Sequence, residues 1–81
     1  MNLEFTLRFY DEKSQKLIRE IELSGVTVDL LVQIMGENYR EGFCDSWPMD
    51  QEKIRKITRF LSRNDLAMLP NGEAFLDCDE V

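Results

Sequence analysis

Histidine is absent from the 81-residue sequence, and only two cysteines, Cys44 and Cys78, are present. Histidine is the most common general base in enzymes and a frequent metal ligand, so its absence counts against catalysis and against a metal site. The four glycines are scattered and form no phosphate-binding loop, and no serine lies in a hydrolase motif. We therefore expect no enzyme activity, no cofactor and no bound metal.

Long hydrophobic runs are also absent. No apolar stretch approaches the ~18 residues of a membrane-spanning helix, and the N-terminus lacks the basic and apolar regions of a signal peptide. We therefore expect a cytoplasmic protein. In that setting the two cysteines are interpreted first as free thiols, although Cys44 and Cys78 could pair.

Positive charge is scarce. The chain has 16 Asp and Glu residues against 10 Lys and Arg residues, which gives a formal net charge of −6. Nucleic acids and anionic membranes both require a basic face, so we expect neither as a partner. An acidic surface favours a basic partner or serves solubility alone.

The clearest structural signal is the alternation of apolar and polar residues from Leu3 to Tyr10. It predicts a strand with Leu3, Phe5, Leu7 and Phe9 on one buried face. Residues 16–23 predict a second strand after a short polar turn, so an antiparallel hairpin is the simplest topology. On its outer face, Arg8 would lie across from Glu20 or Glu22. Residues 74–78 alternate again and predict a last strand beside the hairpin.

Two helices are expected between these strands. Thr27 is a candidate N-cap for the first, which carries an apolar stripe to Met35 and ends near residue 37. The second is predicted from its N-cap, Asp50, to Arg63, and it carries five basic side chains against one acidic side chain. Residues 37–49 are expected to be mostly loop, and residues 66–69 could add a short strand.

These elements predict an α+β fold. A small antiparallel sheet, made of the N-terminal hairpin and the C-terminal strand, packs against two helices in the order ββααβ. The length suits a single domain spanning residues 1–81.

Aromatic and acidic residues are interspersed between residues 37 and 50. Rings supply contact area and carboxylates steer a basic partner, so this segment is a candidate protein-binding surface. The alternative is that Tyr39, Phe43 and Trp47 close the core.

Asp77 and Asp79 form a second acidic group, on one face of the last strand. They could hold Mg²⁺ or act as acid and base, or they could form a solvated edge that discourages aggregation. With this group included, the candidate partner-binding residues are Glu37, Tyr39, Glu41, Asp45, Trp47, Asp50, Asp77, Asp79 and Glu80.

Several segments have a familiar layout when taken together. They are Leu-Arg-Phe-Tyr-Asp-Glu at 7–12, Arg-Glu-Ile-Glu-Leu-Ser-Gly at 19–25, a short amphipathic helix, an aromatic and acidic middle, and Ala-Phe-Leu-Asp-Cys at 74–78. This layout resembles that of small acidic bacterial immunity proteins, such as those of contact-dependent growth inhibition and other polymorphic toxin systems. The resemblance implies a cytoplasmic protein that binds one cognate toxin domain, often a nuclease with a basic cleft, and blocks its active site.

Two functional hypotheses follow. The first is an immunity protein that neutralises a toxin by tight 1:1 binding. The second is a non-catalytic interaction or regulatory module, which could be a homodimer paired through an exposed hairpin edge.

Overall fold

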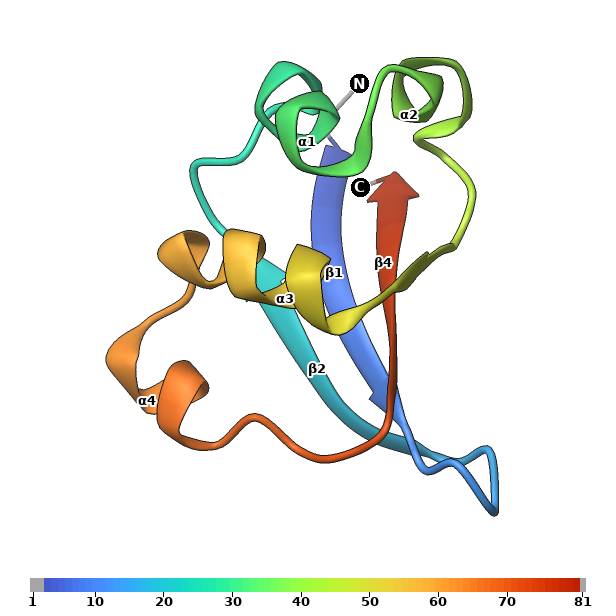
Figure 1. The fold of residues 1–81 in the computed structure, drawn as a ribbon, viewed down its shortest axis with the longest axis vertical. Coiled ribbons are helices and arrows are strands. Elements are labelled where there is room, and N and C mark those ends of the chain that lie inside the picture. The colour runs from blue at the N-terminus through green and yellow to red at the C-terminus, as the bar shows by residue number, and fades with distance from the viewer. Residues whose placement is uncertain (1–2, 81) are drawn as a thin grey trace.

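The computed structural model describes residues 3–80, so residues 1, 2 and 81 of the predicted domain lie outside the described part. The elements in chain order are β1 (Leu3–Tyr10), β2 (Leu17–Leu23), α1 (Val28–Met35), α2 (Asn38–Gly42), β3 (Trp47–Met49), α3 (Gln51–Ile57), the 3₁₀ helix η1 (Thr58–Phe60), α4 (Arg63–Ala67) and β4 (Glu73–Glu80). The strands form one antiparallel sheet in the order β2-β1-β4-β3, and the helices lie on one side of it (Figure 1). The predicted α+β class is confirmed. No helix within residues 3–80 is long and apolar enough to cross a membrane.

The core lies between the sheet and the helices, and β1 supplies its centre. Phe5, Leu7 and Phe9 are buried on the face that their alternation predicted. The helices close the core from the other side with side chains such as Leu31 and Ile57, both fully buried. Each large apolar side chain removed from water contributes about 1.5–3 kcal/mol, so this layer stabilises the fold.

Both predicted N-caps are confirmed. The Thr27 hydroxyl accepts a hydrogen bond from the Leu30 amide at 3.2 Å, and the Asp50 carboxylate accepts one from the Lys53 amide at 2.8 Å. The helix that follows Thr27 stops at Met35, because Gly36 adopts a φ of 101° that ends the helical turn.

The second predicted helix is shorter than expected. Instead of continuing to Arg63, α3 ends at Ile57, η1 follows, and Leu61 is extended. Two local hydrogen bonds account for the change. The Thr58 hydroxyl donates to the Arg55 carbonyl, and the extended Ser62 caps α4 by accepting from the Asp65 amide. The short strand suggested at residues 66–69 is therefore wrong, since its first two residues belong to α4.

The order ββααβ is incomplete because it omits α2, β3 and α4, and α2 and β3 lie in residues 37–49, which were expected to be mostly loop. The β3 strand contains Pro48, which favoured a loop in the sequence, and it is only three residues long. It forms an edge of the sheet, where a residue without an amide hydrogen is tolerated. Trp47 and Met49 pair with Leu76 and Ala74 of β4.

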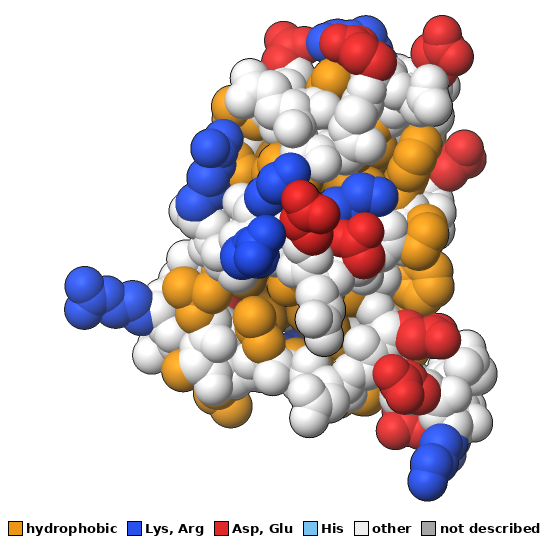
Figure 2. Space-filling model, viewed as in Figure 1, with side chains coloured by type: hydrophobic (Ala, Val, Ile, Leu, Met, Phe, Trp, Pro, Cys, Tyr) orange, Lys and Arg blue, Asp and Glu red, His pale blue; other side chains and the backbone are white. Residues whose placement is uncertain are grey.

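Basic side chains gather on the helix side of the molecule. Figure 2 shows this side, with Lys and Arg side chains grouped over the region of α3. In the sequences of α3 and η1, the basic residues include Arg55 and Lys56 in the last turn of α3 and Arg59 in η1. Acidic side chains lie on this side too, so what sets the two sides apart is the cluster of basic side chains around α3.

Candidate functional site

The side of the sheet away from the helices carries a surplus of carboxylates. Residues directly opposite each other on neighbouring strands point to the same side, so the register places Glu4, Thr6 and Arg8 there together with their partners on β2 and β4. The acidic face, as we call it, consists of Glu4, Glu20, Glu22, Glu73, Asp77 and Asp79. Among the strand residues on this side within 3–80, Arg8 is the one basic side chain.

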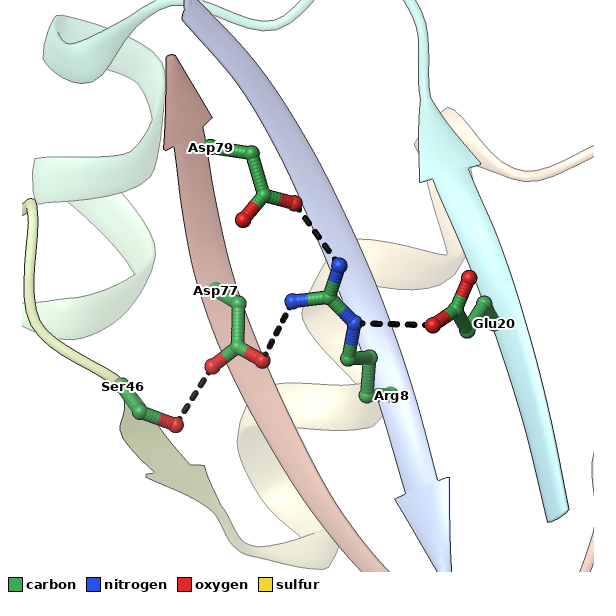
Figure 3. A network of polar contacts seen from close by, with 5 residues as sticks. All are labelled: Arg8, Glu20, Ser46, Asp77 and Asp79. Carbon is green, nitrogen blue, oxygen red and sulfur yellow. Dashed lines mark hydrogen bonds and ion pairs between the residues drawn. The ribbon is translucent and has the colours of Figure 1, made fainter. Parts of the chain in front are cut away.

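Arg8 joins three of these carboxylates (Figure 3). Its Nη1 donates to Asp77 at 2.7 Å, its Nη2 to Asp79 at 2.8 Å, and its Nε to Glu20 at 3.2 Å. The pairing of Arg8 with Glu20 follows the prediction from the sequence. The hydrogen bonds, with Asp77 first and Asp79 second, raise the pKa of Arg8 above its ordinary value, so the guanidinium stays charged.

Thr6 lies beneath this network. Its side chain is on the same side of β1 as Arg8 and directly opposite Asp77, and only 4% of the residue is exposed. The Arg8 guanidinium donates to Asp77, the residue opposite Thr6 on β4. The network therefore joins carboxylates of β2 and β4 through one side chain of the strand between them.

One guanidinium cannot neutralise three carboxylates, and their exposure differs. The Asp77 side chain is 15% exposed, whereas Asp79 is 44% exposed and Glu20 51% exposed. Arg8 contacts one oxygen of each carboxylate, namely Asp77 Oδ2, Asp79 Oδ2 and Glu20 Oε1. Asp79 and Glu20 can therefore accept further hydrogen bonds from a cationic group outside the molecule.

A small open pocket lies beside this network, and we call it the thiol pocket. Its volume is about 230 Å³, and it is lined by Arg8, Cys44, Asp45, Ser46, Asp77, Cys78 and Asp79. The Ser46 hydroxyl donates to Asp77 Oδ1, which connects the turn before β3 to the Arg8 network (Figure 3). The Trp47 Nε1 donates to the Gly42 carbonyl at 2.7 Å and fixes the same turn from its other side.

Three of the predicted contact residues, Asp45, Asp77 and Asp79, come together at the thiol pocket. Asp45 was predicted as part of the aromatic and acidic segment, and the other two as part of the last strand. The topology joins these two groups because the turn at residues 43–46 passes beside the end of β4. Glu80 is exposed at the last described position of that strand.

Tyr39 requires a correction, because it belongs to the core. It is fully buried and packs edge-to-face against Trp47, with ring centroids 5.2 Å apart. Burial raises the pKa of its hydroxyl above the ordinary range. A domain of this size needs its large rings inside, so Tyr39 supports the turn and does not present its ring to a partner. Trp47 is half-buried.

The remaining predicted residues lie elsewhere. Glu37 and Glu41 are exposed around α2, where Arg40 pairs with Glu37 and with Asp29. Asp50 follows the far end of β3 and caps α3. The nine candidates therefore do not form one surface, and the group at the thiol pocket is the most compact.

Sequence reasoning missed that Arg8 organises the acidic face. Its bonds to Asp77 and Asp79 join residues 69 and 71 positions apart, and they exist because β1 pairs with β4. The alternation in β1 and β4 gave a partial indication, since it placed Arg8, Asp77 and Asp79 on the polar faces of their strands. The guanidinium bridges the two aspartates proposed as Mg²⁺ ligands, and no group of three suitable ligands gathers to hold a metal within residues 3–80.

The fold and this site define a small α+β protein whose sheet presents an uncovered acidic face. The chain belongs to a family described as a domain of unknown function (DUF7683), whose family model matches residues 4–69. The matched stretch includes Arg8, Glu20 and Cys44. Comparison with the curated proteins and with the solved structures gave no match.

Proposed function

We propose that this chain is a non-catalytic immunity protein, which neutralises a cognate bacterial toxin domain by placing its acidic face over a basic cleft of that domain. The observation that supports it best is the surplus of carboxylates on the uncovered side of the sheet. Six strand carboxylates share one side of the sheet with a single guanidinium, and the helices lie on the other side (Figure 1). A basic partner can approach this side without meeting a helix.

The Arg8 network makes these carboxylates suitable for tight binding. Side chains that are already fixed lose little conformational freedom on association, so less of the interaction energy is spent on ordering them. Asp79 and Glu20 are held by Arg8 and remain half exposed. In a nuclease cleft they would take positions that phosphate groups of the substrate occupy, and they would accept hydrogen bonds from the same Arg and Lys side chains.

The test is co-expression with the toxin domain encoded next to the gene. We expect the two proteins to co-purify as a 1:1 complex and the toxin to lose activity in the complex. Asp79→Asn should weaken this inhibition, whereas Glu52→Gln, an exposed acid on α3 paired with Lys56, is the matched control and should not. A neighbouring toxin domain that neither binds nor is inhibited would contradict the proposal.

A homodimeric interaction module is the second candidate, and the free edge of β2 favours it. This strand ends the sheet, and Leu17 and Ile18 at its start are 47% and 46% exposed. An open edge can pair with the same edge of a second copy. Sedimentation equilibrium at micromolar concentration tests this candidate, which predicts a dimer that Ile18→Lys dissociates. A strict monomer would contradict it.

A further inference from the structure

Cys44 and Cys78 are far apart in the sequence but line the same pocket. Cys44 is exposed in the turn between α2 and β3, and Cys78 is half-buried near the end of β4. Both are free thiols. The pKa of the Cys78 thiol is raised, mainly by burial and secondly by the neighbouring Cys44 thiol. Both cysteines of the chain therefore line one open pocket.

We propose that Cys44 and Cys78 are a redox site that closes to a reversible disulfide by exchange with a small-molecule disulfide of the glutathione type. The reaction has two balanced steps. The Cys44 thiolate attacks one sulfur of oxidised glutathione, forming a mixed disulfide and releasing one glutathione thiolate. The Cys78 thiolate then attacks the Cys44 sulfur, which forms the protein disulfide and releases the second glutathione.

Exposure assigns the two roles. Cys44 faces solvent and can meet the reagent, whereas Cys78 is partly covered and can reach the adjacent sulfur of Cys44. The thiolate is the attacking form, and the raised pKa of Cys78 makes the second step faster as the pH rises. Charged and titratable groups around this thiol are Tyr39 from α2, Cys44 and Asp45 from the turn, Arg8 from β1, and Asp77, Asp79 and Glu80 from its own strand.

Closure would tie the turn at residues 43–46 to β4. Asp45 follows Cys44 and Asp79 follows Cys78, so the disulfide would fix two carboxylates of the thiol pocket relative to each other. Oxidation would thereby order the thiol pocket, which lies at the edge of the acidic face. This regulatory consequence rests on the proposed function, whereas formation of the disulfide does not.

The experiment uses the full chain alone, titrated with mixtures of reduced and oxidised glutathione and followed by intact mass spectrometry after acid quenching. We expect a monomer that has lost two hydrogen atoms and retains no glutathione, with a Tm raised by roughly 10 °C. Persistent glutathione adducts, a disulfide-linked dimer or unreacted thiols at oxidising ratios would each overturn the proposal.

Two variants test the order of attack. Cys78→Ser should retain glutathione on Cys44, and Cys44→Ser should react several-fold more slowly at Cys78. Equal rates of modification in the two variants would overturn the assigned roles. Circular dichroism of each reduced variant checks that the fold is retained. Because no toxin takes part, failure here leaves the proposed function untouched, and failure of toxin binding leaves this result untouched.

Discussion

At the scale of single residues, Arg8 has the largest influence on the site. It occupies an inner strand of the sheet and bonds three carboxylates from the two neighbouring strands. An exposed ion pair contributes at most about 1 kcal/mol, but removing Arg8 would cost more, because Asp77 is only 15% exposed and would lose its charged partner. The acidic face therefore depends on one basic side chain.

Removal of the Arg8 side chain should lower the stability of the fold. Arg8→Met keeps much of the volume but leaves Asp77 without its charged partner, and we expect the free energy of unfolding to fall by about 2 kcal/mol. Arg8→Lys keeps the charge without the forked geometry and should lose about half as much. Urea denaturation measures both. Equal stability of Arg8→Met and the parent protein would show that the network does not organise the face.

Tyr39 makes a prediction at alkaline pH. Its hydroxyl is buried without a hydrogen-bond partner among residues 3–80, and burial raises its pKa above the ordinary value of 10.0. A group whose pKa is raised on folding favours the folded state below its ordinary pKa, and that stability is lost as the pH rises further. The protein should therefore lose stability as the pH rises above that ordinary value.

The variant Tyr39→Phe isolates this effect. It keeps the ring contact with Trp47 and removes the unpaired hydroxyl, so we expect stability at neutral pH to be unchanged or raised by up to about 1 kcal/mol. The loss above pH 10.0 should be smaller than in the parent protein. Thermal unfolding followed from neutral to alkaline pH is the measurement. Because the raised pKa of Cys78 acts in the same direction, Cys78→Ser is the necessary comparison.

At the scale of elements, short helices depend on their caps. The α3 helix has seven residues, and helices of this length are marginal without capping and packing. Asp50→Ala should lower the free energy of unfolding by about 1 kcal/mol, because the Lys53 amide loses its acceptor. The exposed neighbour Gln51→Ala is the control and should change stability by less than about 0.5 kcal/mol. Chemical denaturation of both variants would settle the comparison, and equal losses would contradict the role of the cap.

Elements with a strong local pattern could be predicted from the sequence. Alternation located β1, β2 and β4 and the buried side of β1, and the residue types of Thr27 and Asp50 located two helix starts. The β3 strand could not be found this way, because three residues including a proline carry no period. Its pairing is decided by the neighbouring β4, which is a tertiary effect.

At the scale of the whole molecule, the sheet topology brings together residues whose proximity could not be predicted from the sequence. Cys44 meets Cys78, and Arg8 meets Asp77, because β4 pairs with β1 on one side and β3 on the other. Composition indicated the surplus of acid but not that Glu20, Asp77 and Asp79 meet at one basic side chain. Some residues of the candidate site could therefore be predicted from the sequence. Their arrangement in space followed only from the strand order.

The measurement that tests the central claim most directly is the association rate with the toxin domain encoded beside the gene. Electrostatic steering by the acidic face predicts a rate that falls at least about tenfold as salt rises from ~50 to ~500 mM. Asp79→Asn together with Glu20→Gln should lower the rate at low salt and flatten this dependence, while Glu52→Gln should leave both unchanged. A rate insensitive to salt, or equally affected by all three substitutions, would contradict binding through the acidic face.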